Sequence, residues 1–146
     1  MLQIGEFFGA SEPTVSISGV TIAGGATSSS PQADLFFGVP GVWAIGGGVY
    51  IPPDDGFNPG ATVTITDSAI SDNTASPTAT FVDPSNPMWP VCPSGFCPFA
   101  GASGGGIASD GRLTLTRVTV SDNRAIGPVA SDADGGGIYV GFAGGR

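Results

Sequence analysis

The side chains that could carry acid–base or metal chemistry in this sequence are almost all carboxylates. The chain of 146 residues has 12 Asp and Glu, 4 Lys and Arg, 2 Cys and no His. Without His there is neither Ser-His-Asp nor Cys-His catalysis and no His-ligated metal. Carboxylates alone can act as general acid and base on a glycosidic bond, or can hold Ca²⁺. Sugar cleavage and calcium binding are therefore the chemistries to test against the sequence.

Four of the aspartates have a structural explanation. Asp72 and Asp122 recur at the same position of a repeat, and Asp110 precedes a glycine, as turn residues do. Asp67 is equivalent to Arg117 of the next repeat, which predicts an exposed ion pair. The carboxylates left over as weak calcium candidates are Asp54, Asp55, Asp132 and Asp134. The calcium-binding nonapeptide GGxGxDxUx is not matched, so we expect no metal site and no cofactor, with Ca²⁺ as the alternative. No composite catalytic motif is found, so we expect no catalytic residue in this chain.

The aromatic and thiol side chains gather in one Pro-rich segment, PSNPMWPVCPSGFCPF. Trp89, Phe96 and Phe99 could form a stacking platform for a sugar ring or a peptide, or they could pin the segment to the body of the protein. Cys92 and Cys97 are spaced for a small disulfide loop, with free thiols as the alternative. Two thiolates without His make a poor zinc site.

Three copies of one pattern organise the chain and must position these residues. TVSISGVTIAGG (14–25), TVTITDSAISDN (62–73) and RLTLTRVTVSDN (112–123) align without a gap. Apolar residues alternate with Ser and Thr within each copy, which predicts half-buried strands. Glycine triplets begin a second motif at 46–51, 104–109 and 135–140, where we expect backbone corners. The segments that interrupt the repeats as insertion loops are 26–45, 52–60 and 74–103.

Strands that recur at long and similar spacing should stack in parallel, because hairpins would leave only a few residues between partners. We therefore predict an all-β solenoid in which each repeat is one coil. Asn73 and Asn123 occupy equivalent positions and would stack as a structural Asn ladder. The first copy has Gly25 there, so the ladder should stop at that repeat.

The combination of GGGI, an LTLT strand and VSDNxA resembles the repeat of right-handed parallel β-helix proteins of the pectin-lyase-like superfold. It is particularly similar to the Gly-Gly and Asn repeats of polymorphic outer-membrane proteins and related bacterial surface proteins. The resemblance implies a right-handed β-helix of about three coils in an exported or cell-surface bacterial protein. The three aligned copies, the acidic composition and the lack of a catalytic constellation favour a structural or adhesive role over an enzymatic one, with loops that bind a glycan or another surface protein. The alternative is a polysaccharide lyase or glycoside hydrolase whose catalytic residues lie on coils outside this chain.

Charge and the chain ends complete the expectation. A net charge of −8 argues against nucleic acid and anionic membranes as partners, and no apolar run approaches the roughly 20 residues that span a bilayer. The start of the chain lacks the basic region of a signal peptide. Arg146 aligns with Arg112, so residues 1–146 read as a single module that is an incomplete fragment stopping within a coil. Open coil ends favour end-to-end association.

The outward faces of the repeats suggest one minor alternative. Ser16, Thr64 and Thr114 would form one hydroxyl column, and Ser18, Thr66 and Thr116 a second. Such columns resemble those of ice-binding β-solenoids. The competing explanation is that Thr is simply favoured on any solvated strand.

Overall fold

The longest strands form where Val, Ile or Leu alternates with Thr or Ser. They are β2 (Thr14–Ser18), β9 (Thr62–Thr66) and β14 (Arg112–Thr116). All three pair in parallel without a shift, with Val63 of the central strand between Val15 and Leu113. The computed structural model describes residues 1–4, 13–28, 35–36, 39–40, 42–52, 61–77, 100–127 and 132–141, and this part is all-β. It has no helix that could cross a membrane.

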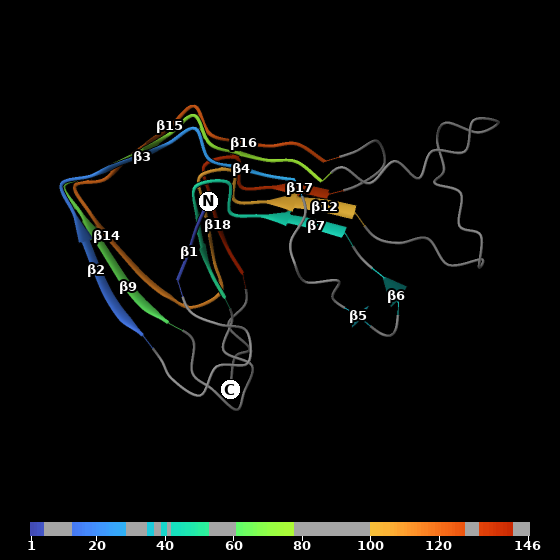
Figure 1. Cartoon of the computed structure of the whole chain (residues 1–146), viewed down its shortest axis with the longest axis horizontal. Coiled ribbons are helices and arrows are strands. Elements are labelled where there is room, and N and C mark those ends of the chain that lie inside the picture. The colour runs from blue at the N-terminus through green and yellow to red at the C-terminus, as the bar shows by residue number, and fades with distance from the viewer. Residues whose placement is uncertain are drawn as a thin grey trace.

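Four more parallel sheets stack in the same way, and we number the sheets along the repeat (Figure 1). Sheet 1 is β2, β9 and β14. Sheet 2 is β3 (Thr21–Ala23), β10 (Ala69–Ser71) and β15 (Thr119–Ser121). Sheet 3 is β4 (Ala26–Thr27), β11 (Thr74–Ala75) and β16 (Arg124–Ala125). Sheet 4 is β7 (Val42–Ile45), β12 (Ala100–Ser103) and β17 (Asp132–Asp134). Sheet 5 is β1 (Leu2–Gln3), β8 (Val49–Ile51), β13 (Ile107–Ser109) and β18 (Ile138–Val140).

The chain therefore passes through sheets 1 to 5 in order, and it makes this pass three times. Each pass adds one strand to every sheet, and β1 is the additional strand of sheet 5. A separate antiparallel pair, β5 (Leu35–Phe36) and β6 (Val39–Pro40), lies between the first strands of sheets 3 and 4 in the sequence. Parallel sheets stacked in this order are compatible with a β-helix or solenoid.

Corners between sheets are made by residues with positive φ at equivalent positions of each repeat. Between sheets 1 and 2 they are Gly19, Asp67 and Arg117; between sheets 2 and 3 they are Gly24, Asp72 and Asp122; between sheets 4 and 5 they are Gly46, Gly104 and Gly135. Asp tolerates this left-handed region better than most residues do. The repeat thus turns at fixed places in the sequence, which keeps every sheet in register.

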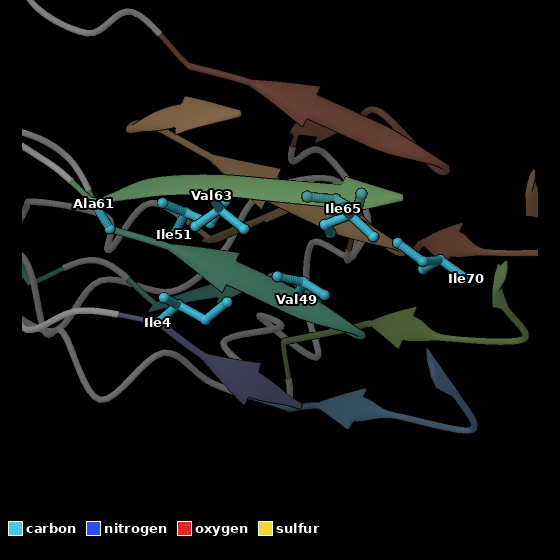
Figure 2. Packing of buried hydrophobic residues seen from close by; sticks show 8 residues of the cluster. Ile4, Val49, Ile51, Ala61, Val63, Ile65 and Ile70 are labelled. Carbon is cyan, nitrogen blue, oxygen red and sulfur yellow. The ribbon is translucent and has the colours of Figure 1, made fainter. Parts of the chain in front are cut away.

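The main core lies between sheets 1, 2 and 5, as Figure 2 shows for its central side chains. Val63, Ile65 and Ile70 of the middle repeat are fully buried because a repeat covers them on either side. Their equivalents in the outer repeats, such as Val15 and Leu113, are only half-buried. Val20, which lies between β2 and β3 in the first repeat, is 40% exposed.

A second, narrow core lies between sheets 3 and 4. It consists of Ala44, Ala75 and Ala102, with Ala125 packed against them. Methyl side chains take so little space that the two sheets approach closely face to face. This pairing holds together the part of the repeat from which the longest insertions leave.

The predicted boundaries of two insertions are wrong at both ends. The segments 26–45 and 74–103 begin and end with strands of sheets 3 and 4, so the insertions are shorter than predicted. Strands of two residues, and Ala-rich or Gly-rich strands such as AGAS, carry too little alternation to be recognised from the sequence.

Candidate functional site

The candidate site is the edge at which each repeat leaves sheet 3 and returns to sheet 4, which we call the insertion edge. It is bounded by the ends of β4, β11 and β16 and by the starts of β7, β12 and β17. The insertions 28–41, 76–99 and 126–131 all depart from and return to this edge. Sequence segments far apart in the chain are thereby anchored side by side (Figure 1).

Backbone hydrogen bonds fix the departure points. The N–H of Ser76 donates to the carbonyl of Thr27 at 2.8 Å, and the N–H of Ile126 donates to the carbonyl of Ala75 at 2.8 Å. The buried Thr27 hydroxyl donates to the carbonyl of Gly46 at 3.1 Å, which ties sheet 3 to the corner after sheet 4. A rigid base of this kind holds the ends of variable loops in constant positions.

The predicted binding residues belong to the second insertion, but they lie outside the described residues. This holds for Trp89, Phe96 and Phe99, and for the proposed disulfide partners Cys92 and Cys97. The structure therefore establishes where their segment is anchored, between β11 and β12.

The calcium candidates are divided in the same way. Asp54 and Asp55 lie outside the described residues, whereas Asp132 and Asp134 begin and end β17, and Asp134 is exposed. Within the ranges that the structure describes, no three His, Cys, Asp or Glu side chains come together as metal ligands would. The described part of the chain thus shows no metal centre.

Asn73 and Asn123 bond directly to each other, and both side chains point back along the stack. The Asn73 amide donates to Asn123 Oδ1 at 2.9 Å and to the carbonyl of Ile22 at 3.0 Å. Its own Oδ1 accepts from the N–H of Gly25 at 2.8 Å. Asn123 repeats this geometry one repeat later by donating to the carbonyl of Ile70 at 2.8 Å. Each Asn therefore fastens its own repeat to the preceding one.

The structure makes three polar groups prominent, Ser68, Asp110 and Tyr139, of which the sequence analysis gave a role only to Asp110, as a turn residue. The buried Ser68 hydroxyl donates to the carbonyl of Thr66 at 2.6 Å, and it aligns with apolar residues in the other repeats, so its spacing carried no signal. Asp110 is half-buried, and burial raises the pKa of its carboxyl. Burial also raises the pKa of the Tyr139 phenol, helped by the negative charges of Asp110 and Asp134. A phenol with a raised pKa stays protonated near neutral pH and cannot act as a base.

Asp67 and Arg117 form a bidentate ion pair across two corners of the stack. The Arg117 Nη2 donates to Asp67 Oδ2 at 2.7 Å, and Nε donates to Oδ1. The guanidinium lowers the pKa of the Asp67 carboxyl below its ordinary value, with slight desolvation opposing this. Because the folded-state pKa is depressed, the pair stabilises the fold above the ordinary pKa of Asp. That contribution is lost as the pH falls through the depressed value.

Replacing Arg117 with Asn, which tolerates the positive φ at this corner, should return the Asp67 pKa to its ordinary value. A carboxyl-carbon NMR titration measures this directly. Arg124→Asn is the matched control, since Arg124 bonds to no side chain of this pair, and it should leave the Asp67 titration unchanged. An Asp67 pKa that is the same in Arg117→Asn as in the wild type would contradict the assignment.

The hydroxyl columns on sheet 1 are in register. Thr64 pairs with Ser16 and Thr114, and Thr66 pairs with Ser18 and Thr116. These side chains alternate with the core residues and lie on the outward face, exposed in the outer strands and half-exposed in the central one. The scaffold thus presents a flat hydroxyl surface on sheet 1 and its variable sequences at the insertion edge.

Comparison with models of protein families, with curated proteins and with solved structures finds no significant match for this chain. The arguments about function therefore rest on the geometry above.

Proposed function

We propose that this chain is a right-handed parallel β-helix module of an exported or cell-surface protein, serving as a structural or adhesive scaffold. Its loops bind a glycan or another surface protein. The proposal rests on one observation: three insertions of different sequence are anchored on one edge of a regular stack. Rigid repeats that carry variable loops on one side are a common construction of binding surfaces.

The sequence of the second insertion supports the choice of ligand. Aromatic rings stack on sugar rings and on peptide side chains, and this insertion contains Trp89, Phe96 and Phe99. The second insertion leaves from the end of β11. Because β11 lies between β4 and β16, this departure point lies between the departure points of the other two insertions. A ligand held at this departure point would lie between the ends of β4 and β16, from which the first and third insertions leave.

A glycan array and a panel of extracellular-matrix proteins, probed with the full chain, would test this function. Trp89→Ala should weaken binding to any ligand found by at least about tenfold, as expected when an aromatic residue at the centre of an interface is lost. Val20→Ala shortens an exposed apolar residue between β2 and β3, far along the sequence from the second insertion, and should bind as the wild type does. Equal binding by the Trp89→Ala variant and the wild type would remove this loop from the proposed surface.

A further inference from the structure

The two ends of the stack have equivalent outermost strands in sheets 1 to 4 and differ in sheet 5. Sheets 1 to 4 contain three strands each, whereas sheet 5 contains four. At one end the outermost strands are β2, β3, β4 and β7, with β1 as the outermost strand of sheet 5. At the other end they are β14, β15, β16, β17 and β18. In the described part of the chain, each of these strands in the parallel sheets pairs on one side only.

The strand rows at the two ends match each other in register. The pairings of the middle repeat place β14 and β2 on opposite sides of β9, with Leu113 and Val15 both opposite Val63. The same equivalence relates β15 to β3, β16 to β4 and β17 to β7. A second copy of the chain can therefore continue sheets 1 to 4 with no change of register.

Sheet 5 is the exception, because the second copy would bring its β1 to the position that β18 already holds. Continuous stacking requires one of these two strands to leave. The register Leu2↔Val49↔Ile107↔Ile138 shows that β1 and β18 are equivalent strands. Leu2, Gln3 and Ile4 thus correspond to Ile138, Tyr139 and Val140, and both triplets are apolar at the first and third positions.

The two strands differ in how deeply their side chains are buried. The backbone bonds that hold β1 against β8 include one from the N–H of Leu2 to the carbonyl of Gly48 at 2.7 Å and one from the N–H of Ile4 to the carbonyl of Tyr50 at 3.0 Å. Its buried contribution is Ile4, which is 7% exposed, while Leu2 is 42% exposed. Val140, the residue equivalent to Ile4, is 68% exposed. An exchange of β1 for β18 would bury Val140 in the place that Ile4 vacates.

We propose that this chain associates end to end with further copies of itself, and that β18 of one copy displaces β1 of the next and pairs with its β8. All five sheets then continue across the junction. β1 and the β18 of the neighbouring copy compete for the same edge of β8, and β1 has to dissociate before the neighbouring copy can pair there. The competition makes association depend on protein concentration.

Charges at the junction are compatible with a second copy of the chain, and hydrogen bonding there sets the strength of the contact. The receiving strands, within residues 13–28, carry no charged side chain, so Arg112, Arg117 and Arg124 at the other end meet no like charge there. The Asn ladder does not cross the junction, because Asn123 would face Gly25, which has no amide side chain. The junction is therefore weaker than the contacts between repeats within one chain.

Sedimentation velocity of the full chain over a wide concentration range would test the proposal. The wild type should show association that increases with concentration. Ile4→Asp places a charge in the buried seat of β1 and frees that seat, so it should strengthen association at least about tenfold. Val140→Asp changes an exposed residue of the monomer and should weaken association at least about tenfold, since the charge would enter the core of the next copy. Thr64→Asp, on the outward face of the middle repeat, is the matched control and should associate as the wild type does.

The double variant Ile4→Asp with Val140→Asp separates strand exchange from aggregation of unfolded chains. Strand exchange requires Val140, so the double variant should be monomeric and keep its far-ultraviolet circular dichroism. Association of the double variant as strong as that of Ile4→Asp would overturn the proposal. So would a wild type and an Ile4→Asp variant that both remain monomeric at the highest concentration.

Discussion

Asn73→Ala is expected to lower the free energy of unfolding by about 3 kcal/mol, since it removes the three hydrogen bonds of a fully buried side-chain amide. The side chain is fully buried and bonds to three residues, Gly25, Ile22 and Asn123. Its removal leaves the N–H of Gly25 and the Oδ1 of Asn123 without their bonds to this amide. The gap lies in the middle repeat, where a repeat covers it on each side.

Asn123→Ala is the matched control, because the same residue type at the same position of the next repeat is only half-buried. Water can reach the gap that it leaves, so we expect a loss of about 1 kcal/mol. Urea unfolding followed by circular dichroism gives both values. If the two variants lost equal stability, the burial of the Asn73 amide would not be what makes the ladder strong.

Gly105→Ala is expected to cost more than about 3 kcal/mol or to prevent folding, because no space exists for a methyl group at this position. A Cβ on Gly105 would overlap the carbonyl oxygen of Gly136 and the backbone of Arg124. Backbone atoms of stacked strands cannot move away without breaking the register of two sheets. The second glycine of the triplet thus lets neighbouring repeats approach to backbone contact.

Gly136→Ala makes the same change in the next repeat and serves as the control. The atom nearest to the added Cβ would be the backbone carbonyl oxygen of Asn123 at 3.4 Å, which is an ordinary contact. The change in stability should therefore stay within about 1 kcal/mol. Thermal unfolding of both variants measures the difference. Equal destabilisation by the two substitutions would indicate that the triplet is needed for its flexibility rather than for close approach.

Much of the scaffold could be predicted because its signals repeat. The alternation of Val and Ile with Thr and Ser gave the strands of sheet 1, and the congruent spacing gave their parallel stacking. The strands at residues 74–75 and 100–103 could not be predicted. Their side chains are small, so they owe their strand conformation to the alanine core and to pairing with neighbouring repeats rather than to their own pattern.

The candidate site was less accessible to sequence reasoning than the scaffold. The equivalence of Asn73 and Asn123 follows from spacing, but the direction in which their amides bond depends on the corner geometry at Asp72 and Asp122. The common edge of the insertions depends on sheets 3 and 4, which the sequence did not reveal. The proposed binding residues of the second insertion, such as Trp89, have no repeated counterpart and were proposed from residue type alone.

The insertion edge also bears on how such a protein can diversify. Residues 28–41, 76–99 and 126–131 differ widely in length, yet the strands on either side of them keep the same register. Loop length adds only slowly to the entropy cost of closing a loop, so segments at this edge can be lengthened, shortened or exchanged with little effect on stability. Mutation can therefore change the sequences displayed at this edge without changing how the module folds, and new sequences could be grafted onto the same three anchor points.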